Sequence, residues 1–244
     1  MSRQRSDDSA PAALVSLGLS SPNLRSLDVA REGREFADRL SSLLNRTVTD
    51  GIRLSWATQG DFIHVGYGVT PSDLGASSPF AVNPGKAGQG LALSVWFLLG
   101  PDAEDEYVQV QTSVFEVYAD IADEGSSLLH VDYQRDKDDY PESHLQVYAS
   151  SEHWERASTR SLDRLHLPVG GRRFRPSLED VLEFLLGEGL STGRAGWETA
   201  IGEHRDAFRR TQLKAAVRRD PETARSALAD YDQRAKATAA RRKR

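Results

Sequence analysis

The 244-residue chain carries 31 Lys and Arg against 36 Asp and Glu, a formal net charge of −5, and 39% of its residues are hydrophobic. This composition is typical of a globular protein with a core of its own and excludes an intrinsically disordered chain. The absence of cysteine excludes disulfides, Cys-ligated metal sites and a cysteine nucleophile. Frequent Ala, Gly and Asp, with many more Arg than Lys, are typical of a GC-rich bacterial genome.

The N-terminal region lacks the features of a targeting segment. Residues 1–11 are polar and mixed in charge, and no part of the chain approaches the ~18 consecutive apolar residues of a membrane span. We therefore expect a cytoplasmic protein with no membrane partner. Residues 1–21, rich in Ser, Ala and Asp, are predicted to form a disordered leader.

The first predicted helix begins at Pro22 and carries apolar residues at helical spacing as far as Leu44. The period then changes to two, and residues 52–56 and 62–69 predict a hairpin. A long loop rich in Pro and Gly is expected over residues 70–90.

Residues 91–99 are almost all apolar, which predicts a central strand buried on both faces. Residues 107–118 predict the next strand. Its apolar positions alternate through Val108, Val110 and Val114 and then change phase at Phe115 and Val117, and we expect a bulge near Val114 to cause the change.

Residues 128–134 and 144–149 predict the clearest hairpin, because their apolar residues alternate and match across the turn. Residues 165–169 add one more strand, and helices are expected over 177–186, 194–218 and 221–240. The fold class is therefore α+β, with a mostly antiparallel sheet of about six or seven strands packed with an N-terminal helix and C-terminal helices. The predicted domains are an α+β domain over residues 22–190 and a helical extension with a basic tail over 191–244.

The polar face of this hairpin gathers side chains that can transfer protons. Alternation places His130 and Asp132 on the same face as His144. If the turn is centred near Asp139, Asp132 lies opposite Gln146 and diagonal to His144, within about 5–8 Å. A carboxylate and an imidazole at this separation could act as an acid–base pair, and two histidines with an aspartate could equally bind a divalent metal.

Further groups extend this face. His166 lies on the polar side of the following strand and would be a third imidazole, while Tyr140 and Tyr148 are candidate proton donors or stacking platforms. We name His130, Asp132, His144 and His166 as the candidate catalytic residues. The alternative is an ordinary solvated sheet face, on which His, Asp and Gln are common.

A second cluster precedes the helix expected at 177–186. Arginine side chains and a helix N-terminus both favour anions, so phosphate binding is predicted for Arg172, Arg173, Arg175 and Ser177. The alternative is local neutralisation by Glu179, Asp180 and Glu183, which would make the cluster a salt-bridged helix cap.

The remaining sequence signals concern partners. The C-terminal helices carry an apolar stripe from Trp197 to Phe208 and end in a basic segment, so we expect core or partner-helix packing and weigh nucleic acid as a further partner. The chain contains no P-loop, no G-x-G-x-x-G after a strand, no H-E-x-x-H and no G-x-S-x-G, and no cofactor is predicted.

Four segments carry a resemblance to a known family. They are HVDY at 130–133, PESHLQV at 141–147, LHLP at 165–168 and RPSLEDVLE at 175–183. Over residues 128–186 the chain resembles the TumE-like toxin components of bacterial toxin–antitoxin systems, which have a His-bearing hairpin followed by a similar helix. The first hypothesis is a toxin or phage-defence protein that acts on nucleic acid, and it rests on the histidines that face one side of the hairpin and on the arginine-rich helix cap. The alternative hypothesis is a scaffold without a catalytic site, which binds a protein partner through its C-terminal helices.

Overall fold

The computed structural model describes residues 28–75, 77–86, 88, 90–102, 107–139, 141–157, 161–169 and 175–242. The chain divides into two compact units, Met1–Trp197 and Glu198–Arg244. The predicted leader at residues 1–21 lies outside the described residues.

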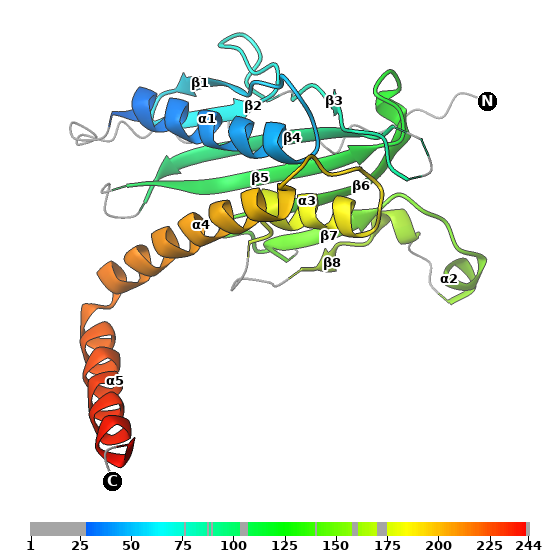
Figure 1. The fold of residues 1–244 in the computed structure, drawn as a ribbon. Helices are drawn as coiled ribbons and strands as arrows, with labels where there is room; N and C mark the ends of the chain where they lie inside the picture. Colours follow the sequence, from blue (N-terminus) through cyan, green and yellow to red (C-terminus); the bar gives the residue numbers. More distant parts are fainter. Residues whose placement is uncertain are drawn as a thin grey trace. The chain divides into compact units, whose positions relative to one another are not determined.

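The described part of the first unit contains one sheet with helices and short turns (Figure 1). The strands are β1 (Ser55–Gln59), β2 (Phe62–Gly66), β3 (Phe80–Ala81), β4 (Ala92–Pro101), β5 (Val108–Tyr118), β6 (Ser127–Gln134), β7 (Ser143–Val147) and β8 (Leu167–Pro168). The helices are α1 (Val29–Thr47), α2 (Glu152–Ala157) and α3 (Leu178–Gly187), with 3₁₀ turns η2 (Glu124–Ser126) and η3 (Leu162–Arg164).

All the paired strands run antiparallel, in the order β1-β2-β4-β5-β6-β7-β8, with β3 paired to β4 off this path. The predicted α+β class, with its antiparallel sheet, N-terminal helix and C-terminal helices, is confirmed. The sheet has eight strands, because the segment expected to be a loop over 70–90 also contributes the two-residue strand β3.

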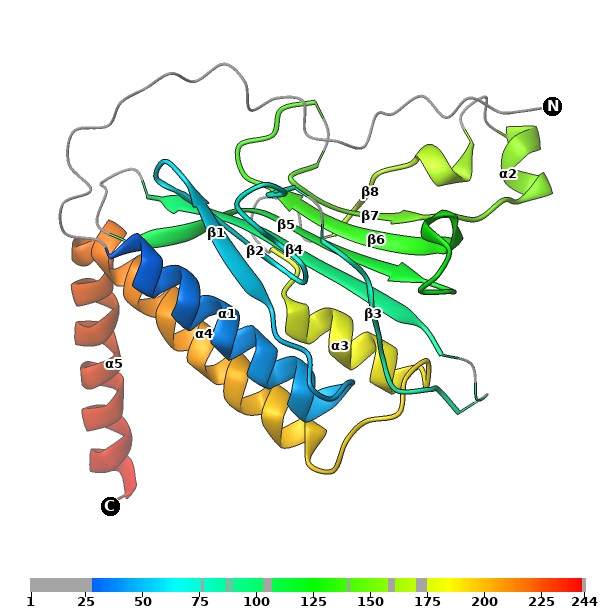
Figure 2. The same ribbon diagram turned by 90° about the horizontal axis from the view of Figure 1, so that it is seen from above.

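Helix α1 covers one face of the sheet, and α3 lies on the same face (Figure 2). The side chain of Asp28 caps α1 by accepting a hydrogen bond of 3.0 Å from the backbone N–H of Arg31. Farther along the helix, Phe36 packs edge-on against Phe97 of β4, with ring centroids 5.0 Å apart. The core therefore lies between this face of the sheet and the helices.

The opposite face carries a second apolar cluster. There Trp96 and Leu98 of β4 pack with Ala57 and Val69, and the Trp96 indole N–H donates a 2.9 Å hydrogen bond to the carbonyl of Leu74. This second cluster explains why β4 is buried on both faces, as predicted. It involves strands β1, β4 and β5 and the segment after β2, and the same face of β6 and β7 carries the candidate site.

Strand β5 contains the predicted bulge, but at Gln111, three residues before the expected position near Val114. Leu98 pairs with Thr112 and Leu99 with Val110, which leaves Gln111 without a partner on β4. After this residue, Phe115 and Val117 face the helices, and Val114 packs on the second cluster. The prediction placed the bulge too late in the strand because Val114 is apolar although it does not face the helices.

The second unit contains two helices, α4 (Trp197–Arg219), whose first residue belongs to the first unit, and α5 (Pro221–Arg242). Ile201 is buried, whereas Leu213, Val217, Leu228 and Tyr231 are exposed. Within the described residues, the helices are too short or too polar to cross a membrane.

The close packing of α1 on the sheet predicts that Gly33→Ala destabilises the protein. An added Cβ would lie 2.8 Å from Cγ2 of Ile63, which is fully buried, and 3.2 Å from the Trp56 ring. We expect the free energy of unfolding to fall by about 1–3 kcal/mol, measured by urea denaturation. Gly187→Ala in α3 is the matched control, because a Cβ there meets nothing within 4 Å. Equal stability of the two variants would contradict the packing.

Candidate functional site

The pairing of β6 with β7 brings the predicted catalytic residues together. Asp132 lies directly opposite His144, and His130 lies opposite Gln146. We expected Asp132 opposite Gln146, so the predicted register is wrong by two residues. The cause is the turn, where Asp136 adopts a left-handed backbone conformation (φ 57°) and the N–H of Gln134 bonds the carbonyl of Glu142.

One carboxylate oxygen of Asp132 faces two imidazoles. Its Oδ2 lies 3.3 Å from Nε2 of His130 and 3.7 Å from Nε2 of His144. One ligand atom from each of these three residues lies within 4.8 Å of the others, which is close enough for all three to contact one metal ion. The three residues are called the His–Asp–His cluster below.

His166 joins this cluster from the segment before β8. Its ring lies edge-on to that of His144, with centroids 4.7 Å apart. The segment is held against β7 because Pro168 pairs with His144 and the Gln146 side-chain amide donates to the carbonyl of Asp163 at 2.5 Å. The strand predicted over 165–169 is shorter than expected, at two residues.

The second ring nitrogen of each clustered histidine also has a partner. Nδ1 of His144 lies 3.3 Å from the carbonyl oxygen of Pro141. Because a carbonyl can only accept, this contact requires a proton on Nδ1 and leaves the Nε2 lone pair directed at Asp132. Nδ1 of His130 lies 3.0 Å from the hydroxyl of Tyr148, so this predicted tyrosine does reach the cluster. Tyr140 lies outside the described residues.

Burial favours the neutral forms of the His–Asp–His cluster. The exposed fractions of its side chains are 14% for His130, 25% for Asp132 and 4% for His144. Burial, and then the nearby charge of Glu116, raise the pKa of Asp132 to about 7. Burial, and then the neighbouring His166, lower the pKa of His144 to about 4, and burial also lowers the pKa of His130.

Glu116 is the site residue that the sequence analysis missed. It lies on β5 directly opposite His130, and its Oε2 accepts a 2.7 Å hydrogen bond from the Tyr118 hydroxyl. Its charge influences the pKa values of Asp132 and Tyr148, and the pKa of Tyr148 is raised to about 12 mainly by burial. The sequence could have revealed Glu116 only if the bulge at Gln111 had been known, because the bulge decides which face of β5 carries Glu116.

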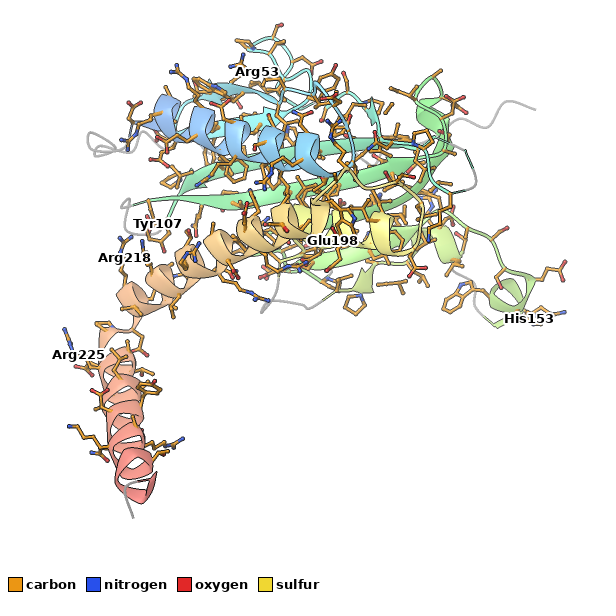
Figure 3. The ribbon with its side chains drawn as sticks, viewed as in Figure 1. Arg53, Tyr107, His153, Glu198, Arg218 and Arg225 are labelled. Atoms are coloured by element: carbon orange, nitrogen blue, oxygen red, sulfur yellow. The ribbon has the colours of Figure 1, made fainter. Side chains whose placement is uncertain are left out.

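The other histidines of the chain come from other elements. His64 is on β2, His204 is on α4, and His153 is on α2 at the periphery of the sheet, beside Arg156 (Figure 3). His153 is exposed and therefore serves as a control position in the experiments below.

The predicted phosphate-binding residues do not join the His–Asp–His cluster where they are described. Arg175 lies with its guanidinium 6.0 Å from the ring of Tyr133, whose side chain faces the opposite side of the sheet from Asp132. The hydroxyl and N–H of Ser177 both donate to Asp180 Oδ2, at 2.8 and 2.9 Å. Arg172 and Arg173 lie outside the described residues, and phosphate binding stays a prediction.

Comparisons with protein-family models, with curated proteins and with solved structures find no match to this chain. The resemblance to TumE-like toxins over residues 128–186 stays a prediction.

The raised pKa of Asp132 predicts how stability depends on pH. With a pKa of about 7 in the folded state and an ordinary value of 3.8 when unfolded, the protonated carboxyl stabilises the fold at low pH, and this contribution is lost as pH rises to 7. From pH 5 to pH 7, we expect wild type to lose about 2 kcal/mol of unfolding free energy relative to Asp132→Asn.

Urea denaturation in EDTA at several pH values measures this difference. The lowered pKa of His144 acts in the opposite direction, because its contribution grows as pH rises from 4 to 6.5, but it is present in both proteins and cancels. A difference that does not change with pH would contradict the buried position of Asp132.

Proposed function

We propose that the chain is a cytoplasmic bacterial enzyme of the toxin or phage-defence type that cleaves phosphodiester bonds in nucleic acid. The observation that carries the proposal is the convergence of three imidazoles and one carboxyl from β6, β7 and the segment before β8. Three of the six histidines of the chain lie in this one place. The resemblance of residues 128–186 to TumE-like toxins supports the choice of substrate.

Phosphodiester cleavage needs one group to take a proton from the attacking hydroxyl or water and another to protonate the leaving oxygen. A carboxyl with a pKa of about 7 is populated in both states at neutral pH, which suits Asp132 to the first role. His130 and His144 would flank the Asp132 carboxyl with their Nε2 atoms, and the Nε2 lone pair of His144 would accept a hydrogen bond from its protonated form. His166, on the segment at the sheet edge, would donate the second proton.

The proposal predicts that cleavage depends on Asp132 and His144. We expect Asp132→Asn and His144→Ala to lower the rate of cleavage of RNA or DNA by at least about 100-fold, because each removes a proton-transfer group or its partner. His153→Ala should leave the rate unchanged. The measurement is gel analysis of labelled RNA, single-stranded DNA and duplex DNA, with EDTA and with added Mg²⁺, Mn²⁺ or Zn²⁺.

Two results would oppose this function. Wild-type protein that leaves all three substrates intact in every condition would remove its support. Cleavage at the wild-type rate by both site variants would assign the activity to another part of the chain or to a contaminant.

A second candidate function, binding of a protein partner, rests on the helices of the second unit. Leu213 and Val217 are spaced four residues apart on α4, Leu228 and Tyr231 three residues apart on α5, and all four are exposed, by 65%, 43%, 66% and 69%. Apolar pairs at these spacings form a stripe that a partner helix can cover.

This second candidate function predicts that substitutions in the exposed apolar stripes of α4 and α5 abolish binding of the partner. We expect a protein that co-purifies stoichiometrically from the native cell with wild type to be absent from the Leu213→Glu, Leu228→Glu double variant. Matched changes at Thr211 and Arg225, also exposed on α4 and α5, should retain it. If the partner co-purifies in equal amount with wild type and with the double variant, these stripes are excluded as the docking surface.

A further inference from the structure

We infer that His130, Asp132 and His144 bind one divalent transition-metal ion through the two Nε2 atoms and the Asp132 carboxylate. Metal binding stands on the geometry of these three residues. Its role in catalysis deepens the proposed function and rests on it.

The first support is the spacing of the ligand atoms. Two ligands about 2.1 Å from one ion lie about 3.0–3.6 Å apart when the angle between them is 90–120°. The distances from Asp132 Oδ2 to His130 Nε2 and His144 Nε2 are 3.3 and 3.7 Å, and the ligand atoms of all three residues lie within 4.8 Å of one another. The side chains therefore need only small movements to contact a shared ion.

The second support is the set of contacts behind the ligands. Metal-binding histidines usually donate their other ring N–H to a carbonyl or another oxygen, which keeps the ligating nitrogen unprotonated. Here Nδ1 of His144 lies 3.3 Å from the Pro141 carbonyl oxygen, and Nδ1 of His130 lies 3.0 Å from the Tyr148 hydroxyl. Both histidines thus present Nε2 to the same carboxylate.

The third support is an unmatched polar atom. Asp132 Oδ1 is buried and has no hydrogen-bond partner, although burying an unpaired acceptor is costly. A cation beside this carboxylate would compensate for the lost hydration. Glu116, opposite His130, adds negative charge on the same face and so favours a cation there.

The donor set indicates the class of ion. Two imidazoles and one carboxylate favour Zn²⁺, Fe²⁺ or similar first-row ions over Mg²⁺ and Ca²⁺, which prefer all-oxygen sites. Three protein ligands leave a coordination position open, and in catalytic sites such a position accepts water or a substrate oxygen. This chemistry fits hydrolysis of a phosphodiester.

The test is metal binding by the full-length chain after removal of metals with EDTA and dialysis. Isothermal titration with Zn²⁺ measures stoichiometry and affinity, and the visible absorption of bound Co²⁺ reports nitrogen and oxygen ligation. We expect one ion per chain and no comparable binding of Mg²⁺.

Asp132→Asn, which is nearly isosteric, should weaken Zn²⁺ binding by at least about 100-fold, and Tyr148→Phe should weaken it by about tenfold. His153→Gln should bind as wild type does.

Further measurements distinguish loss of the metal site from misfolding and from failure of the proposed function. Zn²⁺ should raise the melting temperature of wild type and not that of Asp132→Asn, whose circular dichroism spectrum should match wild type. Wild type that binds no Zn²⁺ or Co²⁺, or Asp132→Asn that binds as tightly as wild type, would overturn the metal site. Metal binding without nucleic-acid cleavage would oppose the proposed function alone. Full cleavage by EDTA-treated, metal-free protein would oppose the role of the ion alone.

Discussion

The candidate site depends on the register between β6 and β7. On the face toward the helices, Val131 pairs with Leu145 and Leu129 with Val147. All four side chains are half-buried, and because side chains alternate along a strand, their placement on this face puts Asp132 and His144 opposite each other on the other face. A shift by one residue would turn the polar set toward the helices and these apolar pairs away from them, so the apolar pattern favours the pairing on which the His–Asp–His cluster rests.

The bulge at Gln111 extends this constraint to the next strand. Without the extra residue, Val108 and Val110 would continue in phase, and Phe115 and Val117 would point away from the helices. With it, Phe115 enters the core, where its ring packs 5.4 Å from that of Phe97, and Glu116 comes to lie opposite His130. The charge that helps to raise the pKa of Asp132 is therefore present on this face because of a bulge two strands away from His144.

Period-two patterning was sufficient to predict the hairpin, its two faces and the meeting of His130, Asp132, His144 and His166. The register was missed because the turn depends on Asp136, and aspartate carries a weaker signal for a left-handed conformation than glycine does. Strand β3 was missed because Phe80 follows Pro79 in a stretch rich in turn residues. Glu116 was missed because neither its facing nor its partner follows from sequence until the bulge is placed.

The burial of the His–Asp–His cluster distinguishes this face from an ordinary solvated sheet face. On an ordinary wet sheet face, His and Asp side chains stay in water and retain their usual pKa values. Here His144 is 4% exposed with a pKa of about 4, and Asp132 has a pKa of about 7. The shift of Asp132 lowers stability at neutral pH, whereas the shift of His144 lowers it below pH 6.5, because folding disfavours the charge state that each group prefers in water at those pH values. Groups that cost stability and converge in one place are typical of functional sites. The arrangement therefore favours a chemical role for the cluster over a role in folding.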